Sequence, residues 1–281
     1  MAAGHMIAPD ERRSLKPPPK PWRARVRGVW EPLVSISAII VLWQLAISLL
    51  GAPGFLLPTP LGVLERMQKD AGLLLFHSAS TTFVTLGAFG VSVVFGLAAA
   101  VAISQSRTVE RFVLPLMVFS QVVPKIAVAP ILIIALGFSA KAHIIVAFLV
   151  CFFPILISTV IGIKSVDAEL IDLTRQLRAG RLQTLGMVVL PHALPHIFSG
   201  LKVAITLAIV GAIVAEWVGS DRGLGYLLLV ANGNFDITLV FAVLVVLTLL
   251  GVVLFLLLDL AERLLLPWHV SRRIGLQQPM Q

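Results

Sequence analysis

Three charged side chains other than histidines lie inside long apolar stretches of the sequence: Lys125, Lys202 and Glu216. A charge at the centre of a membrane helix costs about 2.5–3.5 kcal/mol on insertion scales, so such groups usually face a wet cavity or pair with one another. Lys125 follows Pro124, and a proline within a helix frees backbone carbonyls that also need a polar surrounding. We therefore predict that Pro124, Lys125 and Glu216 border a path for a polar solute. For Lys125 a buried polar partner, and for Glu216 an interfacial anchor or an outside contact, are the alternatives.

The remaining chemical motifs are weak. His192 and His196 stand four residues apart at a predicted helix start, but no third metal ligand is nearby, which favours capping or interfacial roles. Gly223-x-Gly225 is too short for a nucleotide-binding fingerprint, and the sequence has no Walker lysine motif. The single cysteine, Cys151, can form no internal disulfide. We predict no catalytic residue, no metal and no cofactor, and no binding of ATP by this chain itself.

The densest group of charges lies between two apolar stretches, from Lys164 to Leu194. The pattern predicts two short helices, Ala168–Leu177 and Leu182–Val189, joined by a turn at residues 178–180. Such a loop is either a solvated connection or a docking element for a partner that supplies energy. The residues predicted to couple it to that partner are Asp172, Arg175, Gln176, Arg178, Ala179, Gly180, Arg181, Leu190 and Pro191.

The composition requires a bilayer around these motifs. Of 281 residues, 58% are hydrophobic and only 13% are charged, about half the charged fraction of a soluble domain. A helix needs roughly 20 apolar residues to cross about 30 Å of hydrocarbon, and six stretches meet that length. They run over Pro32–Gly51, Thr81–Ile103, Phe112–Phe138, His143–Ile163, Pro195–Trp217 and Ile237–Leu258. The sequence therefore predicts an all-α polytopic membrane protein of about six transmembrane helices, with a short amphipathic helix near residues 58–67.

The distribution of basic residues predicts the orientation. With a cytoplasmic N-terminus, sixteen Lys and Arg fall in inside segments and four in outside segments, which the positive-inside rule favours. This places both termini and the loop at 164–194 in the cytoplasm. We predict a disordered basic tail (1–30), a transmembrane domain (31–268) and a C-terminal tail (269–281). The net charge of +8 follows from this placement and indicates no nucleic-acid partner.

The spacing in the 164–194 loop resembles the cytoplasmic motif of ABC importer permeases, which reads Glu-Ala-Ala, three residues, Gly, nine residues, then Ile-x-Leu-Pro. Here the spacing runs from Asp172 through Arg178 to Leu190-Pro191. The ending matches, but the triplet is Asp-Leu-Thr, and Arg178 stands where the family has glycine, with Gly180 two positions on.

The resemblance extends from about Trp43 to Trp268 and is strongest to the nitrate/sulfonate/taurine branch of binding-protein-dependent permeases. Similar segments are Leu57-Pro58-Thr59-Pro60, Val123-Pro124-Lys125 through Pro130, Ala215-Glu216-Trp217 and Gly223-Leu224-Gly225-Tyr226. The resemblance implies a type I ABC importer fold in a bacterial inner membrane. It also implies a second permease copy forming a homodimer, two ATP-binding subunits and a periplasmic solute-binding protein, with ATP bound by the partners. The implied solute is small, and either anionic or heteroaromatic.

Two other function classes remain as alternatives. A membrane enzyme would need clustered catalytic groups at one depth, and the apolar stretches offer only Lys125, Lys202 and Glu216. A secondary transporter that works without an ATPase is the main rival, and the size and charge of the 164–194 loop favour the ATP-driven importer over it.

Overall fold

The computed structural model describes residues 34–35, 37–47, 49 and 57–267, and the chain divides into two compact units, Met1–Pro60 and Leu61–Gln281. In the first unit, an apolar helix covers Ser37–Ile47. It lies within the first predicted span, Pro32–Gly51, the rest of which falls largely outside the described residues. Both predicted tails, 1–30 and 269–281, also lie outside them.

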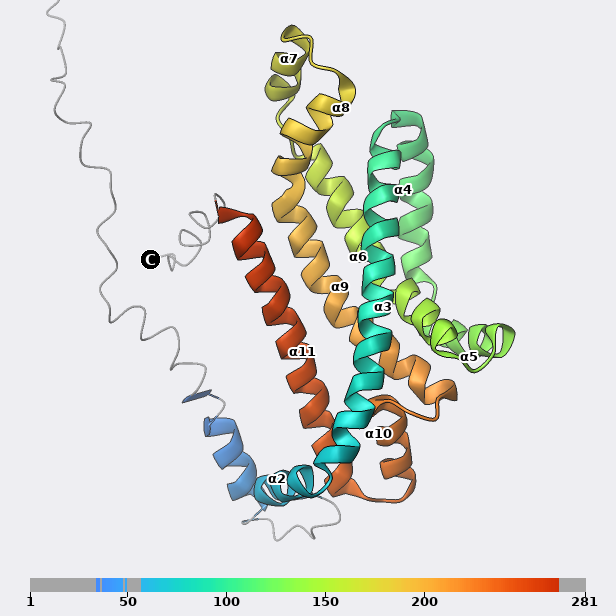
Figure 1. Ribbon diagram of the computed structural model, residues 1–281, viewed down its shortest axis with the longest axis vertical. Helices are drawn as coiled ribbons and strands as arrows, with labels where there is room; N and C mark the ends of the chain where they lie inside the picture. The colour runs from blue at the N-terminus through green and yellow to red at the C-terminus, as the bar shows by residue number, and fades with distance from the viewer. Residues whose placement is uncertain (1–33, 36, 48, 50–56, 268–281) are drawn as a thin grey trace, which may run out of the picture. The chain divides into compact units, whose positions relative to one another are not determined.

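Four long apolar helices form the second unit: α3 (Ala71–Ser104), α6 (Ala140–Lys164), α9 (Leu190–Gly219) and α11 (Ile237–Leu265). Each is long and apolar enough to cross a membrane, and they run lengthwise beside one another in Figure 1. They correspond to the second, fourth, fifth and sixth predicted spans. The first three are extended at both ends, and the sixth is extended only at its C-terminal end. The described part of the chain contains no strand, which confirms the all-α prediction.

Helices α6 and α9 pack along most of their lengths, and small residues bring their backbones together. A Cβ added at Gly211 would lie 2.7 Å from the Cα of Ala147, and one at Gly200 would collide with Ser158. Lipid tails are as apolar as leucine, so membrane helices associate through such close packing rather than through exclusion of water. The α6–α9 seam is therefore the centre of the unit.

The third predicted span, Phe112–Phe138, is two helices rather than one. Helix α4 (Arg107–Val122) starts at Ser106, whose hydroxyl accepts a hydrogen bond from the Val109 N–H, and α5 covers Lys125–Leu136. Val123 is extended (φ −64°, ψ 125°) because a proline disfavours the helical conformation in the residue before it. Pro124 therefore breaks the helix, where the sequence alone predicted an interruption within one span.

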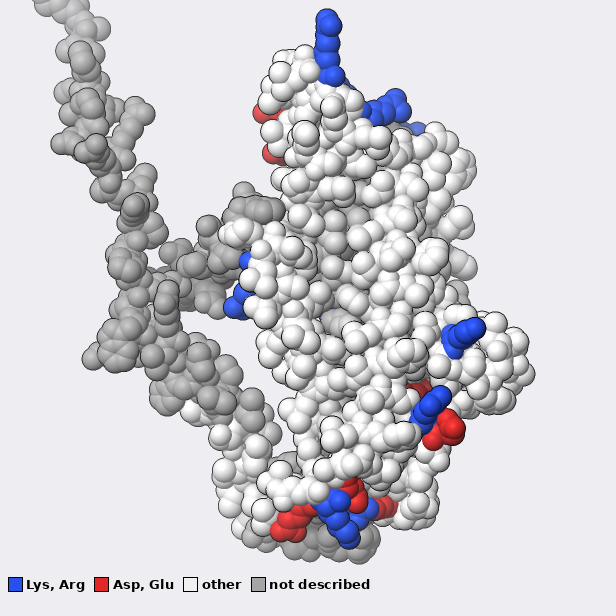
Figure 2. Space-filling model, viewed as in Figure 1, with Lys and Arg blue, Asp and Glu red and all other residues white. Residues whose placement is uncertain are grey.

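Two short helices lie at the end of the unit opposite α7 (Ala168–Gln176) and α8 (Arg181–Thr184) in Figure 1. Helix α2 (Pro60–Lys69) is the predicted amphipathic helix, and α10 (Leu224–Gly233) stands between α9 and α11. Arg66 joins α2 to α11 through an ion pair to Asp236 (2.7 Å), whose other oxygen accepts the Leu239 N–H at the start of α11. Charged side chains of both signs gather at this end in Figure 2. We refer to this end as the α10 end.

Candidate functional site

The predicted docking loop contains the two helical segments that its pattern indicated. Helix α7 spans Ala168–Gln176, and α8 begins at Arg181 after a turn. The turn is a Schellman motif, in which Ala179 N–H donates to the Thr174 carbonyl (3.0 Å) and Arg178 N–H to the Arg175 carbonyl (2.9 Å). These bonds satisfy carbonyls at the end of α7 and fix the direction in which the chain leaves it.

Arg178 occupies the left-handed position of that motif, with φ of 53°. Glycine is favoured there because it has no Cβ to meet the following carbonyl, whereas other L-residues lose about 1–2 kcal/mol. The glycine in the family motif therefore has a conformational reason, and Arg178 adopts the same backbone geometry. The substitution retains the turn and adds a cation to its tip.

The α7–α8 tip exposes both cations and large apolar side chains. Leu177 is 72% exposed and Leu182 is 81% exposed, and Arg175, Arg178 and Arg181 are exposed beside them. The Arg175–Asp172 ion pair (2.9 Å) also lies in the open. Figure 2 shows basic side chains projecting from this tip, with mostly uncharged surface below them. Exposed leucines interleaved with cations are typical of a surface that a partner covers.

Beyond the tip, the helix continues into the fifth span. Helix α8 (Arg181–Thr184) passes through a π-helical segment (Leu185–Val189) into α9, so Arg181–Gly219 is one rod of 39 residues. The Leu190 N–H donates to Leu185, five residues back, and Pro191 has no N–H to donate, so the wider turn accommodates it. The predicted second loop helix, Leu182–Val189, is therefore present as α8 and the π-helical segment. It runs without a break into the fifth span, which starts at Leu190 and not at the predicted Pro195.

Two other polar residues noted in the sequence, His192 and Lys202, each link α9 to a neighbouring helix. His192 lies within hydrogen-bond distance of the Ser165 carbonyl (3.2 Å), so its ring links the start of α9 to the end of α6. Among the described residues no group of three or more His, Cys, Asp or Glu side chains could hold a metal. Lys202 is paired with Glu262 (2.6 Å) and with Asp259, joining α9 to α11.

Lys125 is the first residue of α5, directly after Pro124. Its ammonium lies 4.1 Å from the centre of the Phe153 ring on α6, and the described residues place no carboxylate within ion-pair distance of it. A cation over an aromatic face keeps part of its electrostatic stabilisation without a counter-ion. The side chain is half-buried, and its position on a translocation path stays a prediction.

Glu216 lies at the α10 end, where it is 1% exposed. Its Oε2 accepts hydrogen bonds from Thr81 Oγ1 (3.0 Å) and from the Gly225 N–H (2.8 Å). Thr81 in turn accepts the Leu224 N–H (2.7 Å), and His77 Nδ1 accepts the Gly223 N–H (3.0 Å). Side chains of α3 and α9 therefore satisfy three backbone N–H groups at the start of α10, which no intrahelical carbonyl can reach.

In the described conformation the Glu216 carboxylate faces the protein interior and stabilises a helix N-terminus, where negative charge is favoured. Its place on a translocation path stays a prediction. Sequence reasoning did not identify Thr81 or His77, because they lie about 140 residues before the backbone groups that they bind. Periodicity along one helix cannot reveal such pairs.

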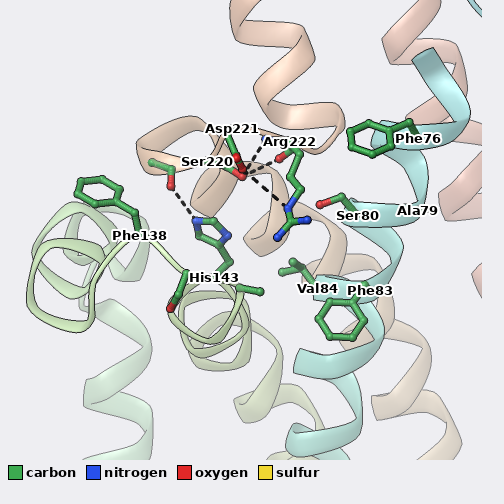
Figure 3. Close-up of a pocket in the computed structure, with 13 residues that line it drawn as sticks. Phe76, Ala79, Ser80, Phe83, Val84, Phe138, His143, Ser220, Asp221 and Arg222 are labelled. Atoms are coloured by element: carbon green, nitrogen blue, oxygen red, sulfur yellow. Dashed lines mark hydrogen bonds and ion pairs between the residues drawn. The ribbon is translucent and has the colours of Figure 1, made fainter. Parts of the chain in front are cut away.

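A pocket of about 780 Å³ opens beside this network. Helix α3 contributes Phe76, Ser80 and Phe83, and the α5–α6 junction contributes Phe138 and His143. Ser220, Asp221 and Arg222, in the loop after α9, complete its wall, and Figure 3 shows the Arg222 guanidinium pointing into the space between His143 and Ser80. None of the pocket residues was singled out in the sequence.

His143 has a defined hydrogen-bond role in this pocket. Its Nε2 lies 3.1 Å from the Gly219 carbonyl, and a carbonyl oxygen only accepts, so Nε2 carries the hydrogen. In the neutral ring Nδ1 is then an acceptor, and in Figure 3 this second nitrogen faces the side of Arg222. The pocket thus combines aromatic faces with one strong donor group and one ring acceptor.

Comparison with known proteins gives one consistent family. The model of the binding-protein-dependent transport system inner membrane component matches residues 92–268. The riboflavin transport system permease protein of Chloroflexus aurantiacus is 37% identical over 254 residues, covering 89% of this chain and 95% of its own length. The taurine transport system permease protein of Escherichia coli is 32% identical over 248 residues, covering 84% of this chain and 90% of its own length.

A solved structure shows the same fold. The inward-facing methionine ABC transporter MetNI aligns with a TM-score of 0.61 at 20% identity, covering 69% of this chain and 97% of that one. The long helices and the short segments between them therefore form a type I ABC importer permease fold.

Proposed function

Since the chain belongs to the family of binding-protein-dependent transport system inner membrane components, we propose that its α7–α8 tip couples ATP hydrolysis to transport. The chain is the membrane-spanning permease subunit of an ABC importer. The tip inserts into an ATP-binding subunit, and movement of that subunit is transmitted along the continuous rod Arg181–Gly219. The observation that carries this proposal is the exposure of leucines and cations together on a tip with a hydrogen-bonded turn.

The rod gives the proposal a mechanical basis. Helix α9 packs on α6 through backbone contacts at Gly200 and Gly211, and it carries Glu216, which holds α10 at the opposite end. A displacement of the tip therefore has a continuous hydrogen-bonded route to the α10 end. In a packed membrane protein such a route supports alternation between two arrangements better than a flexible loop would.

The proposal includes partners and orientation. Two copies of this chain form the path, two ATPase subunits bind their α7–α8 tips, and a solute-binding protein delivers the solute to the α10 end. The tip then lies in the cytoplasm of a bacterial inner membrane, as the distribution of basic residues predicts. The relatives transport riboflavin and taurine according to their names, which supports a small solute that is heteroaromatic or anionic. Pro124, Lys125 and Glu216 remain the residues that we predict along its path.

Charge reversal at the tip tests the coupling. We expect Arg178→Glu to leave membrane insertion intact and to abolish ATP hydrolysis stimulated by solute-loaded binding protein in proteoliposomes. Glutamate and arginine both have a Cβ, so the left-handed backbone conformation costs both about the same free energy. The variant therefore changes mainly the charge. Arg178→Gln separates loss of the cation from introduction of an anion.

Lys141→Glu is the matched control, because Lys141 is an exposed cation at the start of α6 outside the loop, and it should retain stimulated hydrolysis. Unchanged hydrolysis in Arg178→Glu would show that the loop is a solvated connection. Solute uptake by the permease alone, without any ATPase, would instead establish the secondary-transporter alternative. Because ATP is cytoplasmic, coupling through the tip also fixes the orientation.

A further inference from the structure

The pocket at the α10 end differs in kind from the coupling surface. It is formed by α3, by the α5–α6 junction and by the loop after α9 (Figure 3). Its volume of about 780 Å³ lies in the range of cavities that hold small organic ligands. The buried network of Glu216, Thr81 and His77 fixes the neighbouring backbone from Gly223 to Gly225. The loop that carries Arg222 therefore ends at a rigid support.

We propose that this pocket is a solute-binding site of the permease, and that it accepts a planar heteroaromatic molecule rather than a small inorganic or sulfonate anion. The proposal rests on the transport function above and specifies the solute class for it. The pocket would hold the solute at the mouth of the path after release from the binding protein.

The aromatic side chains argue for a planar solute. Phe76 and Phe83 stand seven residues apart on α3, so they project from one face of the helix about two turns apart, with Ser80 between them. Phe138 lies on the far side of the pocket, beyond His143 (Figure 3). Rings at opposite walls provide stacking faces for a flat molecule, and each such contact contributes free energy beyond the burial of area alone.

The polar groups argue for a heterocycle with acceptors and donors on its edge. The Arg222 guanidinium can donate several hydrogen bonds to ring carbonyls or ring nitrogens, and it can also stack on a ring. His143 Nδ1 offers an acceptor for a ring N–H, since Nε2 already donates to Gly219. A purely hydrocarbon ring would leave His143 Nδ1 without a donor and would use none of the guanidinium's remaining N–H groups.

The charge of the pocket argues against a small anion. Asp221 stands beside Arg222 at 3.8 Å and offsets its charge, so the described lining carries no net excess of positive charge. An anion of a few atoms would leave most of the volume to water and would meet only one guanidinium. Burial of a charge without several convergent donors is unfavourable.

Fluorescence of a flavin probe tests the proposal directly. The full-length permease, together with the ATPase subunits that co-purify with it, is placed in lipid nanodiscs without binding protein and titrated into riboflavin. A pyrimidine base and a purine base are tested by calorimetry. We expect saturable quenching of the flavin or saturable heat with a base, unaffected by a large excess of nitrate or taurine. Arg222→Ala and Phe83→Ala should each weaken this binding about tenfold or more.

Two control variants separate the pocket from general effects. Lys141→Ala removes an exposed cation near the same end, and Phe112→Ala removes an exposed ring on α4, and neither residue lines the pocket. Both should bind the probes as the wild type does. Arg222 and Phe83 are themselves largely exposed, so their variants should fold, and size-exclusion profiles check this.

Three results would overturn the proposal: binding of none of the heteroaromatic probes, displacement of a bound probe by nitrate or taurine, or equal binding in the pocket variants and the controls. Each can be told apart from failure of the transport function. Solute-stimulated ATP hydrolysis that is lost in Arg178→Glu but intact in Arg222→Ala would keep the coupling proposal and reject the pocket.

Discussion

Polar groups are buried and hydrogen-bonded at one end of this subunit and exposed at the other. At the α10 end, Glu216 is 1% exposed and accepts two hydrogen bonds, and the N–H groups of Gly223, Leu224 and Gly225 have side-chain partners. At the α7–α8 tip, the Arg175–Asp172 pair is open to the surroundings, and Leu182 is 81% exposed. One end pairs its buried polar groups mostly within the chain, whereas the other exposes leucines and charged groups together.

The difference indicates how the work of the subunit is divided. Buried polar groups in membrane proteins are stable only when their partners are in place, so the α10 end is a fixed frame around the pocket. The tip retains little buried polar structure that a partner would have to disrupt. Our two proposals assign a different task to each end: the ATPase subunit acts on the tip, and the solute is held at the α10 end.

Gly223→Ala should give the largest loss of stability. Gly223 has φ of 110° and ψ of 160°, a region that is essentially restricted to glycine, and an added Cβ would overlap the carboxylate of Glu216. We expect a loss of more than about 3 kcal/mol in the free energy of unfolding, measured by chemical unfolding in detergent. Gly233→Ala in the same helix is the control, because a Cβ there meets nothing within 4 Å. Equal stability of the two variants would show that the α10 end is not fixed by this network.

Glu216→Ala should have the next largest effect. It leaves the Gly225 N–H buried without its acceptor, which costs about 1–3 kcal/mol, and the Thr81 hydroxyl keeps only the longer hydrogen bond to the His77 carbonyl (3.3 Å). Glu216→Gln keeps one carbonyl oxygen for both donors and should retain most of the stability in a thermal unfolding assay. Glu65→Ala removes an exposed carboxylate on α2 and should change little. If Glu216→Ala were as stable as Glu216→Gln, the hydrogen bonds would not be what stabilises this end.

Arg178→Gly should have the smallest effect and the opposite sign. Glycine relieves the left-handed strain at φ of 53°, so we expect local stabilisation of about 1 kcal/mol. Hydrogen exchange measures this at the Ala179 amide, which donates to Thr174 across the turn. Exchange should slow in Arg178→Gly and accelerate in Arg178→Val. Faster exchange in the glycine variant would mean that the arginine side chain, and not the backbone, holds the turn.

The tip also permits a separation of geometry from charge. Arg178→Gly should keep the turn while it loses the cation, whereas Arg178→Glu keeps the strain and reverses the charge. If stimulated ATP hydrolysis survives the first change and not the second, the docking surface tolerates loss of the cation and excludes an anion.

Local properties of the sequence determined much of this protein. Apolar run length predicted α3, α6, α9 and α11, because each must by itself span the hydrocarbon. The composition of residues 164–194 predicted a turn between two helices at residues 178–180, where Gly180 disfavours a continuous helix. The motif spacing led to the family, which the comparisons confirm.

Other features depended on the tertiary structure. The sequence assigned Glu216 to a path or an interface, and the fold buries it, since the groups that bind it come from α3 and from the start of α10. The sequence did not predict the pocket either, because Phe83, His143 and Arg222 belong to three segments separated by about 60–80 residues. Run length and spacing report what one helix requires of its own residues, whereas a buried hydrogen bond or a cavity wall between segments exists only once packing has brought them together.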